Sequence, residues 1–166
     1  GLGPAASKIY ATREGLSIGG YGEMLYEDSD SSAQLDFLRA VFYFGYKFNE
    51  RWLFNSEIEL EHASTGKSGS ASVEFAYLDY LRSPKLNARF GLVLLPMGFV
   101  NELHEPPVFL GARRPDVERV LIPTTWRESG VGLFGDIGPF SYRTYLVNGL
   151  NASGFSAMGL RGGRQK

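Results

Sequence analysis

The 166-residue chain has no cysteine and only two histidines, His62 and His104. Disulfides, thiolate chemistry and cysteine-based zinc or iron–sulfur sites are therefore excluded. The chain also has no excess of positive charge, because its formal net charge is −1 and its isoelectric point is about 6.2. A chain without an excess of positive charge is not expected to bind nucleic acid.

Long apolar runs are absent as well. No segment approaches the roughly 18 apolar residues of a transmembrane helix, although the strands of membrane barrels would leave a much weaker hydropathy signal. Residues 1–12 contain no apolar core flanked by positive charge, so we expect a mature form without a signal peptide. Aromatic residues, in contrast, make up 14% of the chain and accompany 21 glycines, which is typical of sheet-rich proteins.

Apolar side chains recur at every second position, the pattern of a strand whose two faces differ. In residues 35–48 the even positions from Leu38 onwards are apolar or aromatic, whereas Arg39 and Lys47 occupy odd positions. Residues 52–61 alternate in the same way, with a row of glutamates opposite a largely apolar row. Over the whole chain the pattern predicts seven strands, at residues 16–26, 35–48, 52–61, 73–81, 87–95, 130–137 and 140–148.

For one predicted strand the sequence does not show which face points inward. Each row of residues 73–81 holds one acid, Glu74 or Asp79, so the alternation does not decide which row faces inward.

The connections between the predicted strands alternate in length. Tight links lie near residues 49, 84 and 138, and longer, more polar links lie at 27–34, 62–72 and 96–128. Outer-membrane barrels show this asymmetry, with short periplasmic turns and long external loops. Strand length agrees as well, since about ten residues at ~3.4 Å and a tilt of ~45° cover roughly 24 Å.

Alternation alone does not separate a membrane barrel from a soluble sheet that buries its apolar face. Aromatic residues toward the strand ends favour the barrel, because they resemble interfacial girdles. Charges in the middle of the opposite rows would be costly in a dry core but not in a water-filled lumen. The long segment 96–128 would be unusual in a compact soluble domain unless it had a function. We therefore expect an all-β fold, an antiparallel transmembrane β-barrel, with a soluble or surface β-sheet ligand-binding protein as the alternative.

Several segments in the second half of the chain are distinctive: AYLDY (76–80), RFGLVLLPMG (89–98), NELHEPP (101–107), RPDVER (114–119), LIPTTWRESGVGLFG (121–135) and YLVNGL (145–150). With these segments and a GYGE element (20–23), the chain resembles the phosphate-selective porin O/P-like family of outer-membrane porins. The resemblance implies a barrel of about sixteen strands, usually trimeric, that lies in the bacterial outer membrane and passes small solutes by diffusion. It also implies that the third external loop, here 96–128, folds into the barrel and narrows the pore.

The chain departs from that family in length and in charge. Seven strands are too few, and an odd number of antiparallel strands does not close a barrel with both ends in the periplasm. We therefore expect the N-terminal part of a larger porin, with residues 1–15 as a periplasmic segment, 16–148 as barrel strands and 149–166 as the loop tail of a truncated chain. Phosphate is not predicted as the solute, because a row of glutamates faces inward where the family uses arginine and lysine.

Charged residues of both signs are dense in the long segment and mark the predicted pore constriction. Opposed charges across a constriction set a field that selects solutes, and the alternative is that they pair with each other and hold the loop against the wall. The predicted constriction residues are Glu102, His104, Glu105, Arg113, Arg114, Asp116, Glu118, Arg119, Arg127 and Glu128. The predicted lumen wall, whose alternative is a paired and solvated face, carries Arg39, Lys47, Glu57, Glu59, Glu61, Arg89 and Arg143.

No motif for catalysis or for a cofactor is found. The segment NELHEPP lacks the H-E-x-x-H spacing, and its prolines prevent the helix that this metal motif needs. No G-x-S-x-G elbow is present, and the G-x-G strings at 20–22 and 130–132 lie in predicted strands without a following helix. We therefore predict no enzymatic activity, no metal and no cofactor. The predicted partners are outer-membrane lipid, small solutes or ions, and two further copies in a homotrimer.

Overall fold

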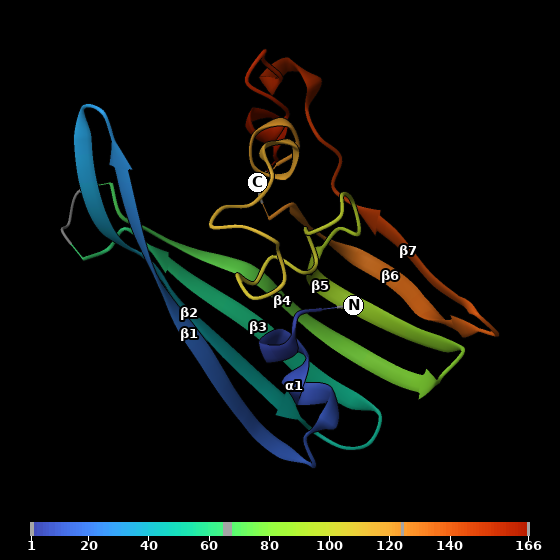
Figure 1. Ribbon diagram of the computed structural model, residues 1–166. Coiled ribbons are helices and arrows are strands. Elements are labelled where there is room, and N and C mark those ends of the chain that lie inside the picture. The colour runs from blue at the N-terminus through green and yellow to red at the C-terminus, as the bar shows by residue number, and fades with distance from the viewer. Residues whose placement is uncertain (1, 65–67, 124, 166) are drawn as a thin grey trace.

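The structure is a computed structural model that describes residues 2–64, 68–123 and 125–165. Seven strands form one antiparallel sheet in which each strand pairs with its neighbours in sequence (Figure 1). The strands are β1 (Gly15–Ser29), β2 (Ser32–Lys47), β3 (Trp52–Glu61), β4 (Ser70–Ser83), β5 (Leu86–Leu94), β6 (Arg127–Ile137) and β7 (Phe140–Val147). The seven predicted strands and the all-β fold class are confirmed. Residues 65–67 of the predicted link 62–72 and residue 124 of the predicted loop 96–128 lie outside the described residues.

The short helical elements lie outside the sheet. They are the α-helix α1 (Pro4–Ala11), the π-helix η1 (Val117–Leu121) and the 3-10 helices η2 (Ala152–Gly154) and η3 (Arg161–Gly163). The sequence pattern does not predict α1, which begins with Pro4 after Gly3 and ends at Ala11, with Thr12 as its C-cap. Eight residues are too few for a stable isolated helix, so α1 depends on the surface against which it packs. Among the described residues, no helix is long and apolar enough to cross a lipid bilayer.

The prediction of a longer loop at residues 27–34 is wrong. β1 continues to Ser29 and β2 begins at Ser32, so residues 30–31 form a two-residue turn. The Ser29 hydroxyl donates to the Ser32 carbonyl at 3.1 Å and closes this turn. All residues from 27 to 34 are exposed on both faces of the hairpin, which leaves no apolar alternation from which a strand can be predicted.

A β-bulge decides which face of β4 points inward. The register between β3 and β4 shifts at Glu57 and Ile58, because Glu57 pairs with Phe75 and Ile58 pairs with Val73. Glu74 is the extra residue, and such a bulge changes the face on which the preceding residues lie. Glu74 and Asp79 are therefore both buried, although they belong to opposite rows in the sequence.

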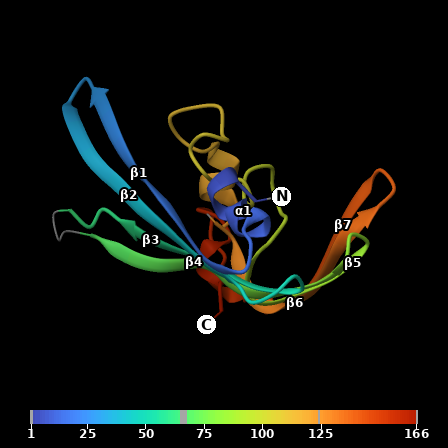
Figure 2. The same ribbon diagram turned by 90° about the horizontal axis from the view of Figure 1, so that it is seen from below.

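The sheet is strongly curved and forms a trough. Figure 2 shows β1 and β7 at its two rims, with α1 and the long connection between β5 and β6 inside the trough. Gly91 in β5 contributes to this close packing of strands, since a Cβ atom there would lie 2.4 Å from the carbonyl oxygen of Ala76. Its φ of +134° is also one that side chains rarely adopt. Glycines at such positions allow a sheet to bend sharply.

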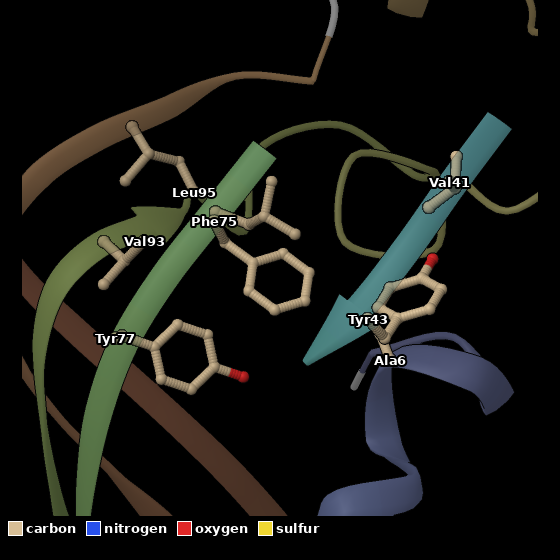
Figure 3. Packing of buried hydrophobic residues seen from close by; sticks show 8 residues of the cluster. Ala6, Val41, Tyr43, Phe75, Tyr77, Val93 and Leu95 are labelled. Carbon is tan, nitrogen blue, oxygen red and sulfur yellow. The ribbon is translucent and has the colours of Figure 1, made fainter. Parts of the chain in front are cut away.

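The two faces of the sheet have the reverse of the usual polarity. On the concave face a small apolar core joins Ala6 of α1 to strand residues such as Tyr43, Phe75 and Tyr77 (Figure 3). The rest of that face is mainly charged. The convex face carries large apolar side chains that are exposed, among them Phe42, Phe44, Tyr46, Trp52, Ile58, Leu78, Phe90, Val131, Leu133 and Leu146.

Candidate functional site

The concave face holds most of the charged residues that were predicted for the lumen wall. Glu57, Glu59 and Arg89 are buried there, with exposed fractions of 1%, 4% and 6%. The cover consists of α1 and the connection 95–126, called the long loop from here on (Figure 2). Buried charges are tolerated only when they are paired and hydrogen-bonded, so the contacts of each group decide what this face can do.

Arg39 of β2 pairs with two of the three glutamates in the row on β3. Its guanidinium lies 2.6 Å from Glu59 through Nη1 and 3.6 Å from Glu61 through Nη2, and its Nε lies 2.8 Å from Glu23 of β1. Residue 39 pairs with residue 61 across the two strands, which brings these groups together. The glutamate row is thus a paired face, as the alternative interpretation expected, but it is partly buried.

The long loop adds further arginines beside this cluster. A hollow of about 260 Å³ is lined by side chains from β1, β2, the end of β3, the long loop and the C-terminal tail. We call it the arginine hollow, because its lining includes Arg39, Arg113, Arg114, Arg119 and Arg161 together with Glu23 and Glu61. Positive charge therefore predominates at this end of the concave face.

Arg114 is the most buried arginine of this hollow, with an exposed fraction of 8%. Its Nη1 donates to the Thr125 hydroxyl at 2.8 Å, and its Nε finds no hydrogen-bond partner among the described residues. Burial and the nearby positive charge of Arg39 lower the pKa of Arg114. An additional anionic or polar group in the hollow would be stabilised by this guanidinium.

His104 attaches the long loop to the wall. Its Nε2 lies 3.1 Å from Glu57 and its Nδ1 lies 3.0 Å from the carbonyl oxygen of Asn101. With Glu57 ionised both partners are acceptors, so both ring nitrogens donate, which only the charged imidazolium can do. Burial disfavours this charge, but the hydrogen bond and the negative charge of Glu57 outweigh burial and raise the pKa of His104.

We expect the attachment of the long loop to weaken as pH rises through the raised pKa of His104. The contribution of such a group is complete below its unfolded pKa of 6.5 and is lost above the folded value. Hydrogen-exchange protection of the loop should therefore fall as pH rises above 6.5 and through the raised pKa of folded His104. His104→Gln, which keeps a donor but no charge, should remove this pH dependence.

His62 provides the matched control for that measurement, because it is the other histidine of the chain and pairs with Asp36 outside the long loop. His62→Gln should leave the pH profile of loop protection as in the wild type. An unchanged profile in His104→Gln would contradict the assignment of the pH dependence to this residue.

Asn101 ties the two ends of the long loop together. Its Nδ2 donates to the carbonyls of Leu95 at 2.7 Å and Trp126 at 2.9 Å, and its Oδ1 accepts from the Trp126 N–H at 2.6 Å. An uncharged asparagine in a loop gives no signal in the sequence that separates it from other loop asparagines. It was missed for that reason.

Glu105 joins the long loop to α1. Its carboxylate accepts from the backbone N–H groups of Ala5 at 3.3 Å and Ala6 at 3.0 Å. A carboxylate at a helix N-terminus satisfies free N–H groups and interacts favourably with the helix dipole. The predicted constriction residue Glu105 is thus a cap for a helix that lies about 100 positions earlier in the sequence.

The other predicted constriction residues contact different partners. Arg127 pairs with Glu74 of β4 at 2.9 Å, within the sheet. Two pairs join the loop to strands: Glu102 with Arg143 of β7 at 3.1 Å, and Arg113 with Glu27 of β1. The remaining contacts are local: Asp116 pairs with Arg119 at 2.8 Å, Glu118 accepts from the N–H groups of Phe99 and Val100, and Glu128 accepts from Trp126 Nε1 at 3.0 Å. Glu102, His104 and Arg113 therefore hold the loop against the wall, whereas the contacts of Asp116 and Glu118 lie within the loop.

Two residues lie elsewhere than predicted. β6 begins at Arg127, three residues before the predicted start at residue 130, so Arg127 and Glu128 belong to the sheet and not to the loop. The predicted strand started at Gly130 because the charged pair before it interrupts the apolar alternation.

A second network lies beneath α1 and was not predicted. Arg89 donates from Nε and Nη2 to the two carboxylate oxygens of Asp79, at 2.8 Å and 2.9 Å. Tyr10 of α1 donates to Asp79 at 2.6 Å and accepts from Arg89 Nη2 at 2.7 Å. The guanidinium also lies over the ring of Tyr77, 3.8 Å from its centroid. Arg89 is thus paired with Asp79 and Tyr10 and is not a free charge of the lumen wall.

The described residues contain no group of three or more histidine, aspartate or glutamate side chains that could hold a metal ion. His104 in particular has both ring nitrogens occupied by protein acceptors.

Comparison with known proteins finds a relative but no family. The chain is 55% identical over 158 residues to an uncharacterized protein of Aquifex aeolicus (strain VF5). The match covers 92% of this chain and 36% of that protein, so the chain spans about a third of the relative's length. No protein-family model matches the chain. No solved structure matches it either.

Proposed function

We propose that the chain forms part of the wall of a porin in a bacterial outer membrane, through which small charged solutes pass by passive diffusion. The observation that carries the proposal is the reversed polarity of the sheet, with apolar side chains on the convex face and paired charges on the concave face. A barrel in lipid needs this arrangement, because its outside contacts hydrocarbon and its inside contacts water.

The size of the apolar face argues against a soluble ligand-binding protein. Monomeric soluble proteins rarely expose contiguous apolar patches larger than a few hundred Å². Here the exposed side chains of the convex face come from all seven strands, for example Ile18 of β1, Phe44 of β2, Phe90 of β5 and Leu146 of β7. A soluble protein would need another layer over the whole of this face.

The contents of the trough support a narrowed, charged passage. The long loop lies within the concave face (Figure 2), where a pore constriction would lie. The arginine hollow, with its paired glutamates, places charges of both signs at the same level, as in selectivity filters that act on charged solutes.

The proposal requires a closed barrel. In the described sheet β1 pairs with β2 alone and β7 with β6 alone, which leaves one free edge on each of the two rim strands. Free edges are not tolerated in lipid. Further strands, outside the 166 residues, would pair with these edges, and outer-membrane lipid would cover the convex face. A homotrimer belongs to the proposal through the family resemblance alone.

Planar-bilayer recordings on the complete polypeptide test the proposal. We expect discrete conductance steps when the purified protein is added to the bilayer. Detergent at the same concentration without protein is the control and should give none. A folded protein that inserts no conducting units would overturn the proposal.

A further inference from the structure

We propose that α1 is a fixed inner wall of the pore and that its side chains, together with the long loop, limit the width of the passage. The inference rests on the proposed pore function and goes beyond it. It assigns a role to residues 4–11, for which the sequence pattern predicted only a periplasmic segment.

α1 is held at both ends by polar groups. At its N-terminus the Glu105 carboxylate accepts the N–H groups of Ala5 and Ala6. Asn55 of β3 donates from Nδ2 to the carbonyl oxygen of Ala6 at 2.8 Å, and Lys47 of β2 donates to the carbonyl oxygen of Tyr10 at 3.3 Å. These contacts come from the sheet and from the long loop, so α1 is fixed to both.

The sheet has a recess that fits α1. Ile9 has an exposed fraction of 2% and lies over Gly45 of β2. A Cβ atom at position 45 would lie 2.9 Å from the side chain of Ile9, so any larger residue there would displace the helix or its own strand. Ala6 enters the core cluster beside Tyr43 and Phe75 (Figure 3). A helix that only rested on the sheet would not need a glycine beneath it.

Tyr10, near the C-terminal end of α1, adds a third member to the buried Arg89–Asp79 ion pair. The Tyr10 hydroxyl bridges Asp79 and Arg89, and it also lies 3.1 Å from the Tyr77 hydroxyl. Polar networks of this kind are stable only when every member is satisfied. Moving α1 out of the trough would leave this pair without its third member, so the structure favours a helix that stays in place over one that swings out.

Space lies between α1 and the strands β5, β6 and β7. A hollow of about 320 Å³ separates them, and its lining includes Ser7 and Tyr10 from α1 and Arg143 and Tyr145 from β7. Solutes that cross the trough at this level would pass between the helix and β7. Ser7 would therefore border the passage, whereas Ile9 faces the wall.

None of the 166 residues is a cysteine, so no native thiol of this segment competes with a disulfide introduced within it. The Ile9 Cβ lies 3.1 Å from the ideal Cβ at position 45, a few tenths of an ångström closer than disulfides require. Because Ile9→Cys removes the branched side chain that fills the recess, a shift of α1 by that small amount is enough for the cross-link. In the complete polypeptide, Ile9→Cys with Gly45→Cys should form a disulfide under mild oxidation without changing the conductance. Ile9→Cys with Phe44→Cys is the matched control, because Phe44 lies on the convex face, and it should not cross-link. Failure of the first pair to cross-link would overturn the position of α1.

A second variant tests whether α1 borders the passage. Ser7→Cys, modified from solution with a charged methanethiosulfonate reagent, should show a stepwise loss of single-channel conductance. Ser31→Cys, at the exposed turn of the β1–β2 hairpin, should react without that loss. Unchanged conductance after complete reaction at Ser7→Cys would overturn the inference. A wild-type protein without channels would instead overturn the pore function, and the cross-link would still report where α1 lies.

Discussion

Replacing Arg89 with leucine is expected to lower the free energy of unfolding by about 3–5 kcal/mol. Arg89 and Asp79 have side-chain exposures of 7% and 0%, so the change leaves a buried carboxylate with Tyr10 as its remaining strong donor. An unpaired buried charge costs more than the pair contributes, because its desolvation is no longer offset. Urea titration of the refolded complete polypeptide in detergent micelles measures the loss.

Two further variants show whether burial is the cause. Arg89→Leu combined with Asp79→Leu removes both charges, and this double variant should recover much of the lost stability. Arg113→Leu breaks an arginine–glutamate pair whose side chains are 46% and 50% exposed, and it should cost at most about 1 kcal/mol. Equal losses in Arg89→Leu and Arg113→Leu would contradict the explanation.

The strands were predictable because their signal is local. Alternation with a period of two depends only on the residues within a strand, and β3 begins at Trp52 and ends at Glu61, as predicted. The signal fails where both faces of the sheet are exposed, as at the end of the β1–β2 hairpin, and where a bulge changes the row, as at Glu74. Neither event leaves a mark in the pattern of apolar residues.

The site was predictable in its residue types but not in its contacts. A charged row opposite an apolar row indicates which strand face is polar, and Glu57 and Arg89 lie on that face. Their partners, His104 and Tyr10, are 47 and 79 positions away in the sequence. Such pairs depend on the curvature of the sheet and on the path of the long loop, which no single segment encodes. α1 was missed for the same reason, since its stability comes from the recess at Gly45.

Placing a charge on the convex face should show whether the sheet is the wall of a membrane pore or part of a soluble protein. Phe42 lies within β2, with Gly20 of β1 and Ile58 of β3 as its cross-strand neighbours, and 43% of it is exposed. If lipid covers this face, Phe42→Arg should cost about 2–4 kcal/mol at mid-depth of the bilayer. In a soluble protein a surface substitution at such a position usually changes stability by less than about 0.5 kcal/mol.

The fraction of protein that inserts into lipid vesicles during folding measures this difference. We expect Phe42→Arg to insert with clearly lower yield than the wild type, because the guanidinium would have to enter hydrocarbon. Ser31→Arg adds the same charge at the exposed hairpin turn and should insert like the wild type. If both variants inserted equally well, the convex face would not lie against lipid. The paired charges of the concave face would then border no channel, because the tube that they are proposed to line exists only when the apolar face is outside.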